Sequence, residues 1–253
     1  MAYGEFAKIY DELINEDIDY DKIAKRIKDI SEEQKIQTLD YLDLACGTGN
    51  VSLRVAKDFK NSFAVDLSED MLREAFEKFK KEKIKSRIVC QDMTELSLNH
   101  KFDLITCVLD STNYILKEED LSNYFNSVAK HLKDDGIFIF DINSYYKLST
   151  ILGNNIYTYN SEDVFYSWEN VFEDEITNMF LTFFIKDGDL YERFEEEHFE
   201  RAYKEEDIEK NLEKCGLHIL GKYDGYTEDS VRDSSERILY VVKKRDGGKT
   251  YER

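Results

Sequence analysis

Five short, continuously apolar runs recur along the first 150 residues, and they limit the possible folds more than any other feature of the chain. They are residues 39–44, 62–67, 87–90, 102–109 and 136–142. Between them the apolar residues follow helical spacing, as Leu72, Ala75 and Phe79 do after the favourable N-cap Ser68. Strands that are apolar on both faces are typical of parallel sheets covered by helices on both sides. The alternation therefore predicts a doubly wound α/β fold.

The pattern changes after residue 150. Residues 155–203 show little helical spacing and many alternating aromatic side chains, among them Phe165, Tyr166 and Trp168. The Asp-Gly-Asp sequence at 187–189 is a hairpin signal. We expect three or four antiparallel strands here, inserted into the α/β domain.

The α/β pattern resumes after this insert. A helix is expected at 204–214, closed by Gly216, and a final pair of strands at 217–223 and 236–243. With the five earlier runs, this pair gives a mostly parallel sheet of seven strands.

Composition excludes several classes of protein. The formal net charge of −19 disfavours a nucleic-acid partner, because such a surface repels phosphate groups. No apolar run is long enough to span a bilayer, and the chain does not start with a basic segment followed by an apolar one. The Cys and His residues form no cluster with ligand spacing, so we expect neither a disulfide framework nor a metal site. We expect a cytoplasmic protein with no membrane partner.

A glycine-containing turn follows the first apolar run, in the sequence DLACGTGN at residues 43–50. Gly47 and Gly49 allow a tight turn and a close approach of the backbone to a ligand. An ordinary strand-to-helix turn has the same composition, so the surrounding residues must distinguish the two. The turn lacks the G-x-x-x-x-G-K-[ST] pattern of a P-loop, and it lacks the third glycine of G-x-G-x-x-G, which weakens an assignment to NAD.

Acidic residues follow the second and third runs. Asp66 ends the second run, where a carboxylate accepts hydrogen bonds from both hydroxyls of a ribose, although Asp66 alone would also suit a helix cap. Gln91, Asp92 and Met93 follow the third run, where the edge of an adenine is expected. Asp92 is a candidate acceptor for its exocyclic amine, and Met93 either packs on the ring or belongs to the core.

Together these motifs resemble the class I S-adenosylmethionine-dependent methyltransferases. The resemblance implies that the turn from Asp43 to Gly49 contacts the methionine part of S-adenosylmethionine, with Ala45 at a position that often holds glycine. It implies that Asp66 binds the ribose and that Asp92 meets the adenine. The cofactor contacts implied in addition are Tyr10, Cys46, Leu67, Met71, Gln91, Met93 and Leu109.

The segments LDLACGTGN, VDLSEDML and FDLITCVLDSTNYI, together with Tyr10-Asp11 near the start, are similar to the small-molecule branch of this family. That branch includes amino-sugar N-methyltransferases and resembles glycine N-methyltransferases. Its members insert an antiparallel lid between the fifth strand and the last helix. The resemblance thus implies a cofactor-binding domain of residues 1–150 and 204–246, and a lid of residues 151–203. It leaves the methyl acceptor open.

Asp110 is the first candidate catalytic residue. Methyl transfer from a sulfonium requires mainly a correct approach geometry and, where needed, a base. Asp110 follows the fourth run, at the edge of the sheet where the cofactor is expected, so it can position or deprotonate an ammonium or a hydroxyl group. Cofactor contact or helix capping would suit this loop equally well. Tyr114 lies in the same loop and is a candidate for acceptor binding.

The insert supplies the remaining candidates. His198 is the second candidate catalytic residue, although a structural histidine suits the sequence somewhat better. Tyr166 and Trp168 either line an acceptor cavity or form the core of the small sheet. Arg201 and Tyr203 return towards the main domain and are candidates for acceptor binding. An aromatic sheet face would also suit contact between two copies, so the sequence leaves a monomer and a homodimer open.

The sequence therefore predicts a methyltransferase that acts on a small molecule, at nitrogen in preference to oxygen. An RNA or protein methyltransferase remains an alternative, although the acidic charge argues mildly against RNA. A protein that binds the cofactor without catalysis is the other alternative, because Gly47, Gly49 and Asp66 concern binding alone.

Overall fold

The computed structural model describes residues 18–245, and Tyr10 lies outside the described residues. A seven-stranded sheet forms the centre, in the strand order β10-β11-β5-β4-β1-β2-β3. β11 runs antiparallel to both of its neighbours, β10 and β5, and the other neighbouring strands of this sheet pair in parallel. Its strands are β1 (Asp40–Leu44), β2 (Asn61–Asp66), β3 (Ser86–Cys90), β4 (Phe102–Cys107), β5 (Leu132–Asn143), β10 (Leu217–Asp224) and β11 (Arg237–Lys244).

Helices cover both faces of the sheet. Those with α-helical geometry are α2 (Tyr20–Glu33), α3 (Ser52–Val55), α4 (Glu69–Lys81), α5 (Glu118–His131) and α6 (Glu205–Lys214). Short helical turns are η1 (Ala56–Asp58), η2 (Met93–Glu95), η3 (Ser111–Tyr114) and η4 (Lys147–Leu152). Side chains of α5 and α6 pack on one face of the central strands, whereas α2, α3 and α4 pack on the other. This two-sided cover explains why β1 and β4 are buried along their whole length.

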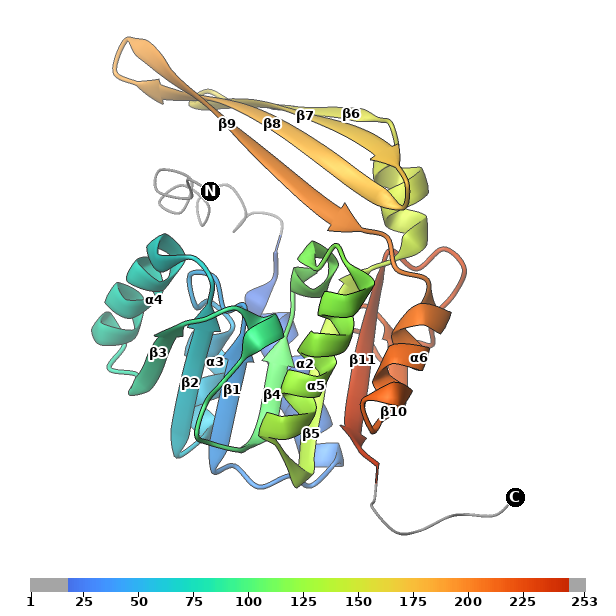
Figure 1. Cartoon of the computed structure of the whole chain (residues 1–253). Helices are drawn as coiled ribbons and strands as arrows, with labels where there is room; N and C mark the ends of the chain where they lie inside the picture. Colours follow the sequence, from blue (N-terminus) through green and yellow to red (C-terminus); the bar gives the residue numbers. More distant parts are fainter. Residues whose placement is uncertain (1–17, 246–253) are drawn as a thin grey trace.

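A second sheet of four antiparallel strands, in the order β6-β7-β8-β9, follows η4. Its strands are β6 (Ile156–Asn160), β7 (Val164–Glu173), β8 (Ile176–Asp187) and β9 (Leu190–Arg201). Figure 1 shows this sheet lying across the edge at which β1, β2 and β4 end, with β9 returning towards α5 and β11. We call residues 151–203 the lid.

One face of the lid is turned towards the main domain. Cross-strand pairing places Tyr166 beside Phe183 and Phe183 beside Phe194 on this inner face. Phe183 packs against Met71 of α4. Nearer the attached end, Met179 packs against Leu148 of η4. Because side chains alternate between the faces of a strand, the inner face of β9 carries its even-numbered residues.

The structure confirms the doubly wound, mostly parallel sheet of seven strands and the antiparallel insert. The hairpin predicted at 187–189 joins β8 to β9. The helix expected after the glycine turn is shorter than its apolar pattern suggests: α3 ends at Val55 and η1 follows. The helix stops because the Lys60 and Asn61 amides already donate to the carbonyls of Thr38 and Leu39, which draws the chain into β2.

No helix within residues 18–245 combines the length and the apolar character that crossing a membrane requires. The same residues contain no group of three or more His, Cys, Asp or Glu side chains placed to hold a metal ion.

Phe140 tests where the stability of the main domain lies. Its ring is fully buried and stacks between Phe138 and Tyr240, with centroids 4.8 Å away on both sides. We expect Phe140→Ala to lower the free energy of unfolding by about 3–5 kcal/mol, measured by urea denaturation, because it leaves a cavity in a close-packed core. Phe76→Ala is the matched control, since the ring of Phe76 is 53% exposed and its removal should cost far less. Equal losses in the two variants would contradict this description of the core.

Candidate active site

The turn after β1 takes an unusual backbone path. Ala45, Gly47 and Gly49 all adopt left-handed conformations, with φ of 52°, 54° and 81°. The Cys46 amide donates to the carbonyl of Val65, so the turn continues the pairing of β1 with β2. The path exposes backbone groups at the edge where ligands bind in such sheets.

Asp66 ties this turn to the next one. One carboxylate oxygen accepts from the Gly47 amide at 2.8 Å, and the other accepts from the Ser68 amide at 2.8 Å. Burial raises the pKa of the Asp66 carboxyl, while these two hydrogen bonds act in the opposite direction. Each oxygen keeps a lone pair, and the neighbouring Leu67 is 58% exposed. The arrangement fits the binding of a ribose beside an open apolar surface.

The two glycines of the turn have different surroundings. A Cβ at Gly47 would meet no atom of residues 18–245 within 4 Å, so these residues leave the space beside it open. A Cβ at Gly49 would lie 2.7 Å from the Phe79 ring and 3.2 Å from Ala75 of α4. Gly49 therefore allows α4 to pack closely on the turn, whereas Gly47 leaves room for a ligand against the backbone. This open space is where the residues present fit a cofactor.

Asp43 faces the interior of the sheet. Its carboxylate is buried and accepts hydrogen bonds from the hydroxyls of Ser52 and Thr106, the latter at 2.7 Å. Burial raises the pKa of Asp43 to about 6, and these hydrogen bonds act in the opposite direction. Asp43 thus links β1 to α3 and to β4, and its part in a site is to hold the turn. Cys46, which lies within the turn itself, is half-buried, and its thiol donates weakly to the carbonyl of Gly47.

The residues after β3 are partly engaged with one another. Asp92 caps η2, because one of its oxygens accepts from both the amide and the hydroxyl of Thr94, at 2.8 and 2.7 Å. The Gln91 side chain accepts from the Ser97 amide at 3.1 Å. Met93 packs against the main core, and its sulfur lies 4.0 Å from that of Cys107. Of the two roles considered for Met93, packing in the core therefore fits its partly buried thioether better than stacking on an adenine ring.

The loop after β4, like the turn after β1, contains residues in left-handed backbone conformations. Leu109 and Asp110 both have positive φ, at 61° and 55°, which side-chain-bearing residues rarely adopt in succession. Both amides donate to the buried carboxylate of Asp141 at the end of β5, at 2.9 and 2.7 Å. These bonds from a neighbouring strand hold the loop in its left-handed form.

Asp141 has two further partners that the sequence analysis did not identify. The Tyr226 hydroxyl donates to one oxygen, and Arg237 donates to the other at 2.7 Å. Arg237 also reaches the Asp110 carboxylate at 2.6 Å, so one guanidinium bridges two acids. The sequence offered one signal for this site: Asp141 is a charged residue near the end of the apolar run GIFIFDI.

The lid brings several of the predicted residues to this edge. His198 lies on the inner face of β9, and its ring meets Tyr114 of η3 edge-on, with centroids 6.0 Å apart. Burial lowers the pKa of His198, while the charge of Asp110 acts in the opposite direction. Tyr166 packs towards Met71, and Trp168 packs near Leu148. The indole N–H of Trp168 is buried without an acceptor among the described residues.

Arg201 and Tyr203 have structural partners instead. The Arg201 guanidinium donates to the Leu116 carbonyl at 2.9 Å and belongs to the face of β9 opposite to that of His198. The Tyr203 ring is buried in the main core, and its hydroxyl donates to the Ile115 carbonyl. Both side chains fasten the end of the lid to the segment before α5.

Glu200 is a site residue that the sequence analysis missed. Glu200 lies between His198 and Arg201 in the sequence, and it is only 3% exposed. Its carboxylate accepts a hydrogen bond from the side-chain amide of Asn143 at 2.8 Å. Burial, and then the charge of Asp110, raise the pKa of Glu200 to about 8. In the sequence it stands at the end of the acidic stretch EEEHFE, which reads as a solvated face.

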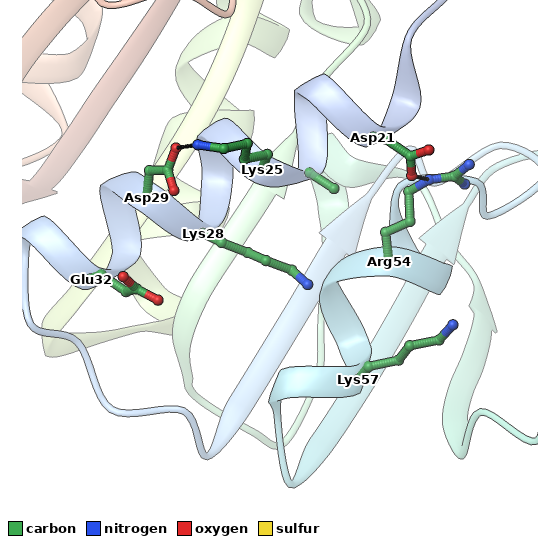
Figure 2. Close-up of a pocket in the computed structure, with 8 residues that line it drawn as sticks. Asp21, Lys25, Lys28, Asp29, Glu32, Arg54 and Lys57 are labelled. Atoms are coloured by element: carbon green, nitrogen blue, oxygen red, sulfur yellow. Dashed lines mark hydrogen bonds and ion pairs between the residues drawn. The ribbon is translucent and has the colours of Figure 1, made fainter.

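A separate groove lies between α2 and α3, away from these residues (Figure 2). Charged side chains line it, and most are paired with one another: Lys25 with Asp29 at 2.6 Å, and Arg54 with Asp21 at 2.5 Å. Such paired charges at the surface are ordinary solvated groups.

A family model and several known proteins are similar to this chain. The family model, described as a methyltransferase domain, matches residues 42–136. A protein of Geobacillus sp. strain WCH70, which carries a methyltransferase name without an acceptor, is 33% identical over 96% of this chain and 100% of its own length. The crystal structure of an S-adenosylmethionine-dependent methyltransferase from Clostridium acetobutylicum ATCC 824 has a TM-score of 0.92 and 53% identity, and the match covers 97% of this chain and 100% of that one.

A third similar protein carries a specific name. It is dTDP-3-amino-3,4,6-trideoxy-alpha-D-glucopyranose N,N-dimethyltransferase from Streptomyces venezuelae, which is 30% identical over 48% of this chain and 49% of its own.

The two glycines should respond differently to alanine. Gly49→Ala should lower the free energy of unfolding by about 2–4 kcal/mol, because the methyl group meets Phe79 and a left-handed alanine is strained. Gly47→Ala should cost only the strain, about 1–2 kcal/mol. It should instead weaken the binding of S-adenosylmethionine, by about tenfold or more, since the methyl group enters the open space. Urea denaturation and calorimetric titration measure the two effects, and the reverse assignment would contradict the site.

Asp141→Asn should destabilise the whole edge. The variant leaves Arg237 without a buried counter-charge and sets an NH2 group against one of the two backbone donors, so we expect a loss of about 3–5 kcal/mol in the free energy of unfolding. Asp135→Asn is the control, because Asp135 is fully exposed and lies 3.9 Å from Lys243. An unchanged urea midpoint for Asp141→Asn would mean that the loop after β4 does not depend on this carboxylate.

Proposed function

This chain belongs to the class I S-adenosylmethionine-dependent methyltransferases, and from that premise we propose that it methylates a nitrogen atom of a small molecule. It is an enzyme, and its cofactor is S-adenosylmethionine, which supplies an activated methyl group on a sulfonium. The nature of the acceptor and the choice of nitrogen are the parts that we propose.

The site residues divide into two groups in this proposal. Asp66 binds the ribose hydroxyls with the lone pairs that remain after its bonds to Gly47 and Ser68. The open space beside Gly47 receives the methionine part, and Leu67 and Asp92 lie at the adenine. Residues 1–150 and 204–246 hold the cofactor in this scheme, and the lid holds the acceptor.

The observation that carries the proposal is the lining of the edge beneath the lid. The inner face of the lid presents aromatic rings, including Tyr166 and Trp168, and ends in His198 and Glu200 close to Asp110. Aromatic faces and carboxyl groups both favour a cationic ligand such as an amine. A sheet lying over the edge also favours a small acceptor over a polymer (Figure 1).

Two further facts support an amine of modest size. The Streptomyces venezuelae relative is named for the N,N-dimethylation of an amino sugar. The net charge of −19 opposes the approach of RNA.

An acceptor assay tests this function. The protein is incubated with S-adenosylmethionine and, separately, dTDP-3-amino-3,4,6-trideoxyglucose, glycine, catechol and bulk tRNA, and products are read by mass. We expect a methylated amine, and we expect Asp66→Ala to lose it because cofactor binding weakens by about 2–4 kcal/mol. Methylation of catechol or tRNA alone would overturn the proposal.

A further inference from the structure

Glu200 is a buried carboxyl to which the cofactor site gives no task. It lies at the attached end of β9, opposite the buried Thr177 of β8, on the same face of the strand as His198. That face meets the ends of β4 and β5. We propose that Glu200 is the catalytic base of this enzyme: it binds the acceptor nitrogen and takes a proton from it before methyl transfer. The assignment rests on the proposed function, in which the acceptor is an amine.

The Glu200 carboxyl is held in a fixed orientation. Its Oε2 atom accepts from the side-chain amide of Asn143 at 2.8 Å. Asn143 is fixed in turn by the side chain of Asn113, which accepts from its backbone amide at 2.9 Å and donates to its backbone carbonyl at 3.1 Å. Lys147 donates to the side-chain oxygen of Asn143 at 3.0 Å. The network therefore clamps one oxygen of Glu200.

The second oxygen has no such partner. Within residues 18–245 no group donates a hydrogen bond to Oε1 of Glu200. Oε1 is not one of the fully buried side-chain oxygens that lack a partner, so this oxygen remains accessible to a ligand. An ammonium or amine group of the acceptor is a donor of the right kind for that oxygen.

Charges around Glu200 place its titration in the range where a base is useful. The charged and titratable groups that face it come from η4, β5, β9, β11 and the loop after β4: Lys147, Asp141, His198, Arg237 and Asp110. Burial and the negative charge of Asp110 raise the pKa of Glu200 to about 8, against the opposing effect of Lys147, Arg237 and the Asn143 hydrogen bond. A base with a pKa near the working pH accepts and releases protons efficiently.

The proposed step balances in atoms and charge. The protonated acceptor amine gives one proton to the Glu200 carboxylate and becomes a neutral amine. Its nitrogen lone pair then forms a bond to the methyl carbon, and the electrons of the breaking carbon–sulfur bond stay on sulfur. The methylated product leaves as an ammonium, and Glu200 returns its proton to water.

A structural role is the competing explanation, in which Glu200 only accepts a hydrogen bond from Asn143. Glu200→Gln separates the two roles, because the amide oxygen of glutamine can still accept from Asn143 but cannot take a proton. Glu197→Gln is the matched control: it makes the same change on the outer face of β9, where Glu197 only accepts from Asn178 at 3.0 Å.

The first measurement needs no acceptor. The carboxyl carbon of Glu200 is followed by ¹³C NMR across a pH titration of the full chain saturated with S-adenosylhomocysteine, and Glu200→Gln assigns the signal. We expect a pKa between about 7 and 8.5. A pKa in the ordinary range of an exposed glutamate would overturn the assignment.

The second measurement is kinetic, with dTDP-3-amino-3,4,6-trideoxyglucose as the probe. We expect Glu200→Gln to lower kcat/KM by about 10²–10⁴-fold, the usual contribution of a general base. In the wild type kcat/KM should fall as the pH drops through about 8, since Glu200 becomes protonated, and this dependence should disappear in Glu200→Gln. Glu200→Asp should retain it at a reduced rate. S-adenosylmethionine affinity, thermal stability and the kinetics of Glu197→Gln should stay close to wild type.

The outcomes distinguish failure of the Glu200 assignment from failure of the proposed function, methylation of an amine. If the wild type methylates the probe and Glu200→Gln does so equally at every pH, the base assignment fails and the proposed function stands. If the wild type methylates no amine, the proposed function fails, and the assignment of Glu200 as an amine base fails with it.

Discussion

The carboxyl edge of the main sheet is held together by strand-end carboxylates that accept hydrogen bonds from neighbouring turns. Asp66, at the end of β2, accepts from the Gly47 amide in the turn after β1. Asp141, at the end of β5, accepts from two amides in the loop after β4. Parallel strands all release their chains at one edge, where the backbone amides of tight turns need acceptors. Lateral carboxylates meet that need and link each turn to the next.

This arrangement places acidic groups where a cationic cofactor and acceptor are expected. Burial raises the pKa values of both Asp43 and Asp66, and the charge of Asp66 adds to the rise at Asp43. Arg237 offsets part of the charge by bridging Asp110 and Asp141. The edge thus combines rigidity with an electric field that favours positive ligands.

Local patterns were enough to predict much of this structure. The continuous apolar runs and the glycine turn depend on neighbours in sequence, and the seven-stranded sheet and the hairpin at 187–189 followed from them. The bridge from Arg237 to Asp141 joins residues 96 positions apart, which no local pattern reveals.

The register of β9 against β8 also could not be predicted from the sequence. The sequence analysis selected His198, which lies on the inner face of β9, and Arg201, which lies on the opposite face, but it missed Glu200 on the inner face. Side chains on a strand alternate between its faces, so a shift of one residue exchanges every inward group for an outward one. Sequence alone predicted a strand here without its register against β8, and only that pairing shows which acidic residue of EEEHFE is buried.

The attachment of the lid has a mechanical consequence. The chain enters the lid from η4 and leaves it towards α6, and pairing of Ile156 with Glu169 and of Ile176 with Arg201 puts both connections at the same end of the sheet. The 12-residue strands β8 and β9 therefore form a cantilever roughly 40 Å long, with the hairpin at 187–189 as its free tip. Rotation of roughly 10° at the attached end would carry that tip through about 7 Å while Glu200, beside the pivot, hardly moves.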